Sequence, residues 1–429
     1  MLNINMVVSL IIFVISFVFF VYGKIHRCIV ALVGATLMVV FGDLRGFYTQ
    51  QQALEAIDFD TLGLLFGMMT IVVILRKTGF FRYLAIKGAK FAKGDPWKLM
   101  VALGLITAFV SMIIDNVTTV LLVAPVTLLV SDILGITAIP ILIEEVVLSN
   151  IGGVGTLVGD PPNIMISSAS TFSFNDFLIH LMPISLIAIG ISLLISRFLC
   201  SSCLVRKEER VREILKMNEW DAIREKAMLL KCIIALIIVV VLFVTEEIHH
   251  LRSSFIALIG ATITLILVRP DPKEVFSQIE WPVLLFFAAL FVIVGGVDQA
   301  GFLKILANGI NRVSSNPVEL TLIVIWLSFV LSSLIDNVPY TAAMIPIIKH
   351  IAALGVNTSP IWWALAIGVG FGGNGTPLGS SAGVVAMGLA ERTKYPLTFG
   401  QWLKYGSIPA LVTTGVASVL MVIGFEWFS

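Results

Sequence analysis

The chain has 429 residues, of which 58% are hydrophobic and 13% are charged, with a formal net charge of +1 and a mean hydropathy of +1.02. This balance excludes a soluble globular protein and indicates an all-α integral membrane protein. The basic residues fall in short runs beside apolar segments, so they indicate membrane topology and not a nucleic-acid-binding surface.

Apolar segments in the first half predict spanning helices at 6–22, 28–42, 61–76 and 178–200. A broken helix over 139–169, interrupted at 151–162 by a glycine-rich stretch, completes a set of five. The second half offers 229–246, 253–268, 281–297 and 404–425, with a second broken helix over 360–389. We therefore expect ten transmembrane helices, two of them broken. The first is retained and is not a signal peptide, because no basic residue precedes it.

Two further pairs of apolar runs flank the dipeptides Asp115-Asn116 and Asp336-Asn337. The runs beside the first dipeptide are about 14 residues long, whereas a spanning helix needs roughly 20. They predict two re-entrant hairpins, at 97–131 and 318–351, whose polar tips lie at membrane depth. An ionisable group there is costly and marks a functional candidate. The alternative is that each Asp only caps the following helix.

The two halves match in a single register, which indicates an internal repeat. Residues 30–36 match 256–262, Gly79 matches Gly301, Pro125 matches Pro346, and 152–156 match 372–376. The predicted division is 1–200 for the first repeat, 201–227 for a charged linker and 228–429 for the second repeat. Each repeat crosses the membrane an odd number of times, so we expect an inverted-topology repeat transporter with its site near the midplane.

Lysine and arginine set the predicted orientation. They crowd the segment 76–98 and the linker, so both are expected in the cytoplasm. We expect the protein in the cell membrane, or inner membrane, with both termini on its outer side. The hairpin at 97–131 enters from the cytoplasm, and the hairpin at 318–351 enters from outside.

Only the first repeat has additional acidic residues beside the break in its broken helix. Asp160 aligns with Ser380, and Glu144 and Glu145 align with Ala364 and Leu365. We expect the two glutamates to pair with a basic residue or to face a vestibule. Asp160 precedes two prolines, a pattern that also fits a helix cap.

Three motifs resemble the ion transporter superfamily: Asp-Asn-Val-Thr-Thr at 115–119, the glycine-rich run at 149–163, and Asp-Asn-Val-Pro-Tyr-Thr at 336–341. The resemblance covers nearly the whole chain. It is strongest to the ArsB-type arsenite/antimonite permeases and the melanosomal P protein. It implies a secondary transporter, not an enzyme, that exports neutral trihydroxides in exchange for protons.

The sodium-driven dicarboxylate carriers of the same superfamily have Ser-Asn-Thr at each hairpin tip, where this chain has Asp-Asn-Val. A carboxylate in place of a hydroxyl can take up a proton, so the change favours proton coupling. Carboxylates also bind hard cations, so sodium stays open as the coupling ion.

Cys28, Cys200, Cys203 and Cys232 all lie away from the tips, so a substrate must be held by hydrogen bonds. The groups suited to this role are carboxamides, hydroxyls and exposed backbone: Asn116, Thr118, Asn337, Thr341, Gly155, Thr156, Asn374, Gly375 and Thr376. The candidates for carrying protons are the acids Asp115, Asp336, Asp160, Glu144 and Glu145. No metal or cofactor is expected.

Other functions stay open at this stage. The sequence has no G-x-x-x-x-G-K-[ST] motif, which argues against a nucleotide-driven pump within this chain. A separate cytoplasmic ATPase partner and a homodimer are both compatible with the sequence. A sodium/proton antiporter or an organic anion carrier of the same superfamily, and an anion channel framed by two hairpins, are the alternatives.

Overall fold

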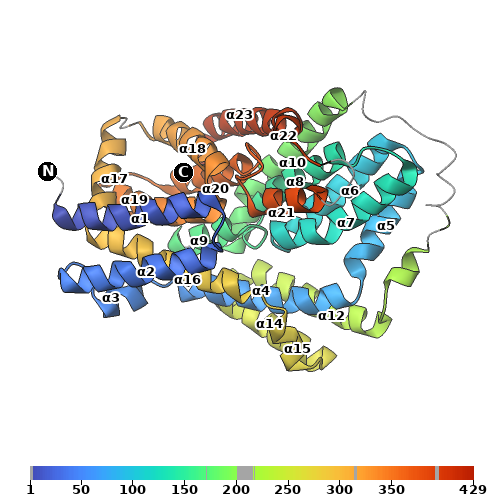
Figure 1. Cartoon of the computed structure of the whole chain (residues 1–429), viewed down its shortest axis with the longest axis horizontal. Helices are drawn as coiled ribbons and strands as arrows, with labels where there is room; N and C mark the ends of the chain where they lie inside the picture. Colours follow the sequence, from blue (N-terminus) through green and yellow to red (C-terminus); the bar gives the residue numbers. More distant parts are fainter. Residues whose placement is uncertain (1–2, 171, 201–215, 217, 314–315, 392–395) are drawn as a thin grey trace.

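The structure is a computed structural model that describes residues 3–170, 172–200, 216, 218–313, 316–391 and 396–429. The regular structure of these residues is helical throughout, and most helices run along the long axis of the molecule (Figure 1). Most of the predicted linker, namely 201–215 and 217 with Cys203, lies outside the described residues.

The first half begins with α1 (Ile4–Tyr22), α2 (Arg27–Leu44), the short α3 (Gln50–Glu55), α4 (Phe59–Lys77) and α5 (Phe80–Ala92). A hairpin of α6 (Pro96–Ser111) and α7 (Asn116–Leu134) follows. The broken helix consists of α8 (Ile139–Val154) and α9 (Pro161–Ser170), and α10 (Phe174–Leu199) ends this half.

The second half repeats this order after the short η2 (Glu219–Ala222). It contains α12 (Lys226–Val244), α13 (Glu246–His249), α14 (Ser253–Val268), α15 (Pro272–Ser277), α16 (Trp281–Gln299) and α17 (Phe302–Val313). The second hairpin is α18 (Pro317–Leu334) and α19 (Asn337–Ala353), and the second broken helix is α20 (Ser359–Gly372) and α21 (Ser381–Glu391). The chain closes with α22 (Phe399–Trp402), η3 (Leu403–Ser407), α23 (Ile408–Ile423) and α24 (Phe425–Phe428).

The structure confirms the predicted all-helical membrane fold with two hairpins and two broken helices. Eight described helices are long and apolar enough to cross a membrane. The hairpin arms α7 and α18 are among them, with 19 and 18 residues, so both are longer than the sequence predicted. The prediction counted only uninterrupted apolar residues. The helix α7, however, continues through Ser131 and Asp132 until Gly135, whose φ of 65° ends it.

Two amphipathic helices, α5 and α17, were not predicted. Each follows a glycine in the left-handed region, Gly79 with φ 81° and Gly301 with φ 87°, which lets the chain turn sharply after a spanning helix. In Figure 1 they lie at opposite ends of the molecule. We call the end with α5, η2 and α15 the linker end, and the end with α3 and α17 the α3 end.

The glycine-rich stretches bring each broken helix onto its hairpin. A Cβ on Gly152 would lie 2.4 Å from the carbonyl oxygen of Ala108 in α6, and one on Gly372 would lie 2.7 Å from that of Phe329 in α18. Thr156 then donates a hydrogen bond to the carbonyl of Met112, and Thr376 donates to that of Ser333 at 2.5 Å. Both breaks are therefore fixed beside the hairpin tips.

The halves also pack against each other crosswise. Helix α2 packs on α16, and α4 packs on α14, so each pair joins one helix from each half. The broken helices α8 and α20, again one from each half, also contact each other. This crossed arrangement places both hairpin tips next to the starts of α2 and α16.

Candidate functional site

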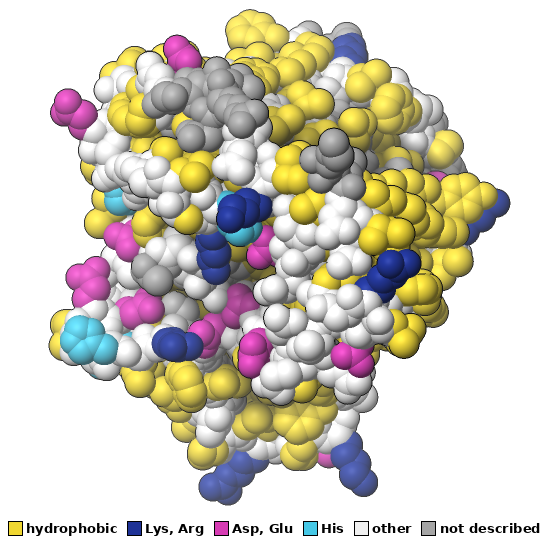
Figure 2. All heavy atoms as spheres, turned by 90° about the vertical axis from the view of Figure 1, so that its left-hand side faces the viewer, with side chains coloured by type: hydrophobic (Ala, Val, Ile, Leu, Met, Phe, Trp, Pro, Cys, Tyr) yellow, Lys and Arg dark blue, Asp and Glu magenta, His cyan; other side chains and the backbone are white. Residues whose placement is uncertain are grey.

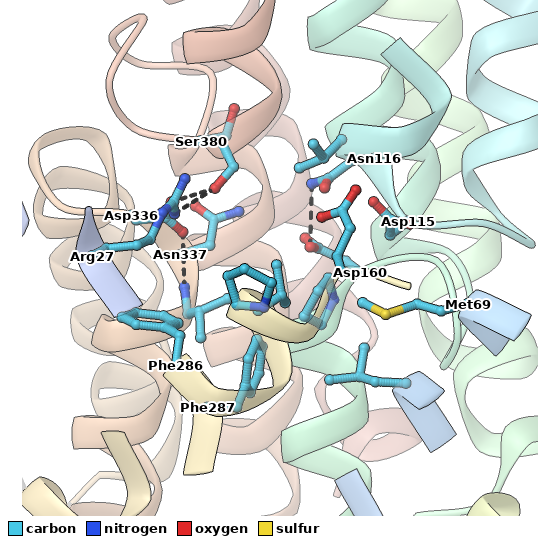
Figure 3. A pocket seen from close by; sticks show the side chains of 18 of the residues that line it. Arg27, Met69, Asp115, Asn116, Asp160, Phe286, Phe287, Asp336, Asn337 and Ser380 are labelled. Carbon is cyan, nitrogen blue, oxygen red and sulfur yellow. Dashed lines mark hydrogen bonds and ion pairs between the residues drawn. The ribbon is translucent and has the colours of Figure 1, made fainter. Parts of the chain in front are cut away.

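The two hairpin tips face a shared cavity of about 290 Å³. Figure 3 shows side chains from both tips converging on it, with Phe286 and Phe287 of α16 below. Its polar lining residues are His26, Arg27, Asp115, Asn116, Asp160, Glu280, Asp336, Asn337, Ser380 and Ser381. Arg27 begins α2, and Glu280 follows α15, so the exposed rim of the cavity lies toward the linker end.

At the first tip, Asp115 caps α7 by accepting a hydrogen bond from the backbone N–H of Thr118 at 2.8 Å. Next to it, Asn116 Nδ2 donates to Asn150 Oδ1 at 2.9 Å and to Asp160 Oδ1 at 3.2 Å. Asp160 is 2% exposed, and its Oδ2 has no hydrogen-bond partner in the described part of the chain. Neither Asp115 nor Asp160 forms an ion pair with any described residue.

At the second tip, Asp336 caps α19 through the N–H of Val338 at 3.3 Å. Unlike Asp115, it has a cationic partner, since Arg27 Nη1 lies 2.6 Å from Asp336 Oδ2 (Figure 3). Ser381 Oγ donates to the same oxygen at 2.5 Å. The Asn337 carboxamide meets suitable partners when its nitrogen points toward α18. In this orientation, Nδ2 donates to Ser332 Oγ at 2.7 Å and to the carbonyl of Gly379 at 2.9 Å.

A buried pair of carboxamides joins the halves behind the cavity. Asn150 Nδ2 donates to Asn374 Oδ1 at 2.7 Å and to Ser380 Oγ at 3.0 Å. In the repeat register, Asn150 corresponds to Gly370, and Asn374 corresponds to Val154. The repeat therefore relates the polar contact between Asn150 and Asn374 to an apolar contact between Gly370 and Val154. A Cβ on Gly370 would lie 2.0 Å from Val154 Cγ2. The two sides of the interface are not equivalent.

Several predicted binding residues lie near the cavity without lining it. Thr156 and Thr376 hold the breaks to the hairpins, and Thr341 Oγ1 donates to the carbonyl of Asn337 at 2.8 Å. Thr118 lies in a small chamber beside the cavity. The others pack inside the breaks: Gly155, Asn374 and Gly375. The structure gives these residues a supporting position behind the tips.

Glu144 and Glu145 lie elsewhere. Both are fully buried in α8, where Glu144 accepts from Ser192 Oγ at 2.9 Å and from Ser196 of α10. Glu145 accepts from Thr127 of α7. The expectation that they pair with a basic residue or face a vestibule was wrong, because hydroxyl groups of neighbouring helices are their partners instead. Glu145 Oε2 is left without a hydrogen-bond partner among the described residues.

Sequence reasoning missed Arg27, Asn150, Glu280 and Ser380 as site residues. Arg27 is 309 positions from Asp336, and no pattern in the sequence links them. Ser380 could have been predicted as a site residue, because it aligns with the candidate Asp160 in the repeat. Asn150 belongs to the glycine-rich motif and was a recognisable candidate.

A second cavity, of about 650 Å³, opens at the α3 end. Its charged lining residues are Glu55, Asp58, Asp60, Arg252, Asp298 and Lys349. Arg252 Nη1 lies 2.5 Å from Asp60 Oδ2, and His350 Nε2 lies 2.6 Å from Asp298 Oδ1. Figure 2 shows this face, with acidic and basic side chains gathered in its central part and hydrophobic surface around them.

Comparison with known proteins agrees with this architecture. The family model described as citrate transporter (CitMHS) matches residues 17–368. The chain belongs to the citrate transporter family. It is 38% identical over 422 residues to an uncharacterized transporter of Mycobacterium tuberculosis, with 97% of each chain covered. It is also 38% identical over 423 residues to a 46 kDa membrane protein of Mycobacterium leprae, which covers 97% of this chain and 98% of the relative.

More distant relatives of this citrate transporter family member extend the same picture. The human P protein is 30% identical over 489 residues, which cover 94% of this chain and 58% of the P protein. Among solved structures, the YdaH transporter of Alcanivorax borkumensis aligns with a TM-score of 0.63 at 17% identity, covering 97% of this chain and 99% of that one. The fold and the family together make this chain a multi-pass membrane transporter.

Proposed function

We propose that this transporter exchanges protons for a small neutral polyhydroxyl solute, with arsenite and antimonite in their trihydroxide forms as the substrates. The observation that carries the proposal is the charge of the central cavity. Three aspartates face it, and among the described residues Asp336 is the only one of the three that is paired with a cation. Unpaired carboxylates at membrane depth are suited to bind protons.

The cavity charge argues against an anionic substrate such as citrate. Four carboxyl groups line the central cavity, and the cations facing them are Arg27 and, when protonated, His26. At the α3 end, four carboxyl groups face Arg252 and Lys349. An anion would meet a net negative potential on entering from either side, whereas a neutral solute or a cation would not.

Hydrogen bonding supports a polyhydroxyl ligand. Asp160 Oδ2 is a buried acceptor without a partner among the described residues, and the carboxamides of Asn116 and Asn337 lie beside it in the cavity lining. A ligand hydroxyl that donates to Asp160 would remove the cost of leaving this oxygen unsatisfied. None of the cysteines in the described part of the chain lines the cavity, so sulfur coordination takes no part in the proposal.

The direction of transport follows from the proposed topology. With the linker end in the cytoplasm, the central cavity is reached from the cytoplasm, and the cavity at the α3 end opens outside a cell membrane. Substrate enters at the linker end, and proton binding at the tips from outside promotes its release. Accessibility of single cysteines placed at Asn218 and at Gln50 tests this orientation; labelling of Asn218 from outside the cell contradicts it.

Transport itself is tested in everted membrane vesicles. We expect an inside-acid pH gradient to drive accumulation of arsenite, with antimonite competing and citrate without effect. Asn116→Ala and Asn337→Ala should each abolish this accumulation, while Asn175→Ala, a change at the start of α10, leaves it intact. Citrate accumulation in place of arsenite, or full activity in both tip variants, contradicts the proposal.

Sodium/proton exchange is the second candidate, because carboxylates are good ligands for hard cations and the cavity carries several. Sodium efflux from loaded vesicles under a pH gradient, without any effect of arsenite, favours it. A voltage-driven current without counterflow instead identifies a channel.

A further inference from the structure

Glu280 lies at the rim of the central cavity and has no role in the mechanism above. It immediately precedes α16, whose N-terminus it flanks without a capping side-chain bond. Its carboxylate forms no ion pair or hydrogen bond with the described residues. Glu280 is therefore exposed and available for exchange with water at the linker end.

Glu280 and Asp115 face each other across two spaces. Both line the central cavity, and both also line a small side chamber of about 20 Å³ together with Arg76, Thr118 and Gln278. A cavity of roughly 10–15 Å³ is enough for one water molecule, provided that polar partners surround it. The side chamber meets both conditions, since two carboxyl groups, a hydroxyl, a carboxamide and a guanidinium border it.

We propose that Glu280 is the proton relay between Asp115 and the aqueous phase at the linker end, acting through one water molecule in the side chamber. The proposal rests on the proposed proton coupling. The protonated carboxyl of Asp115 gives its proton to the water as the water gives one of its own to the Glu280 carboxylate. Glu280 then releases that proton to bulk water. Asp115 is left ionised, and no other reactant is needed.

The charges around Glu280 suit this role. Glu280 is open to water on one side, but protein atoms packed around its carboxyl group partly desolvate it and raise its pKa. The nearby Asp115 raises this pKa further, whereas Arg76 and Arg27 oppose the increase. The other titratable groups facing the central cavity are His26 of α2, Asp160 before α9 and Asp336 before α19. A carboxyl group with a raised pKa takes up a proton more readily than an ordinary glutamate, which favours transfer from the water in the side chamber.

The test uses Glu280→Gln, which keeps the shape of the side chain and removes its titration. The matched control is Glu274→Gln, since Glu274 lies on α15 at the same end, pairs with Lys77 at 2.8 Å and is 58% exposed. In everted vesicles, Glu280→Gln should slow arsenite accumulation driven by the pH gradient about tenfold, a barrier higher by about 1.4 kcal/mol. Arsenite counterflow without a gradient should change less than twofold, because it requires no net proton release.

Glu280→Asp keeps a titratable group and should restore most of the driven rate, which separates a relay from a packing role. If Glu280→Gln retains the rate of the Glu274→Gln control, or loses driven uptake and counterflow together, the relay is wrong. An infrared measurement tests it independently of substrate. After a rapid rise in pH, the carbonyl band that Asp115→Asn removes should disappear about tenfold more slowly in Glu280→Gln.

If the wild-type protein accumulates no arsenite, the proposed substrate fails, and the infrared rates still decide the role of Glu280. Equal rates in the wild-type protein and in Glu280→Gln contradict the relay. If Glu280→Gln does not fold, Glu280→Ala, which also removes the titratable group, replaces it in the same comparison. Glu280→Ala should slow the loss of the carbonyl band about tenfold, and a rate equal to that of the wild-type protein contradicts the relay.

Discussion

The two hairpin tips have the same Asp-Asn-Val sequence but different surroundings. At the second tip, Asp336 is held by Arg27 and Ser381. At the first tip, Asp115 forms no ion pair with a described residue, and Asn116 donates hydrogen bonds to Asp160 and Asn150. The two tips therefore share one sequence, and the residues packed against them determine their charge. Arg27 balances the carboxylate of the second tip, whereas the carboxylates at the first tip are left unpaired.

Asp160→Ser removes the difference between the two tips most directly, because it gives the first repeat the residue that the second repeat has at the aligned position, Ser380. The change removes the acceptor of Asn116 and the orphaned oxygen in the cavity. We expect transport to fall about 100-fold, as expected for loss of a charge-assisted bond worth about 2.7 kcal/mol. Initial rates in everted vesicles measure it, with Ser277→Ala on the exposed surface of α15 as control. A loss under threefold shows that Asp160 is only a helix cap.

Asp115→Asn and Asp336→Asn compare the tips themselves. With a pH gradient of one unit, one-for-one exchange drives at most about tenfold accumulation. We expect Asp115→Asn to reduce this ratio to about one while counterflow continues, and Asp336→Asn to keep most of it, since Arg27 already balances the charge of Asp336. The steady-state ratio of arsenite is the measurement. Equal ratios in the two variants contradict the assigned difference.

Gly370→Ala sharpens the comparison at the interface between the halves. Its Cβ would lie 2.0 Å from Val154 Cγ2, so neighbouring helices must move apart, which costs about 1–3 kcal/mol. Gly190→Ala is the matched control, because no atom of the described residues lies within 4 Å of its Cβ. Thermal unfolding in detergent should show a lower Tm for Gly370→Ala only. A similar Tm in both variants means that this contact is loose.

The smallest expected effect concerns the ion pair of the second tip. A cycle of Arg27→Gln, Asp336→Asn and the double variant should give a coupling of about 1 kcal/mol by thermal unfolding. This figure is well below that of a fully buried pair, because the Arg27 side chain is 41% exposed and water screens the interaction. Additive effects of the two changes would show that the pair contributes nothing to stability.

The sequence predicted the fold well because membrane depth imposes strong patterns. Long apolar runs, two polar tips and two glycine-rich breaks located the hairpins and broken helices, and the repeat register paired Thr156 with Thr376. The amphipathic helix α5 was not predicted, since a helix that is apolar on one face only lacks a long apolar run.

The site was predicted only in part, for a different physical reason. Asp115, Asn116, Asp160, Asp336 and Asn337 meet in the cavity because local motifs place them at the tips and the break. The partners of these residues come from the starts of α2 and α16, and these positions follow from crossed packing between the halves. Patterns read along one segment contain no information about such contacts.

The one-sided carboxamide pair also restricts how this chain can be rebuilt. Two joined copies of the first half would place each Asn150 opposite a Val154, where the present chain offers Asn374. Each copy would then bury a carboxamide with part of its hydrogen bonding unmet, at a cost of about 1–3 kcal/mol per site. Two copies of the second half would put Gly370 beside Asn374 and leave that amide facing a gap. The two halves share one order of elements, yet their residues at this interface are complementary, so neither half can replace the other.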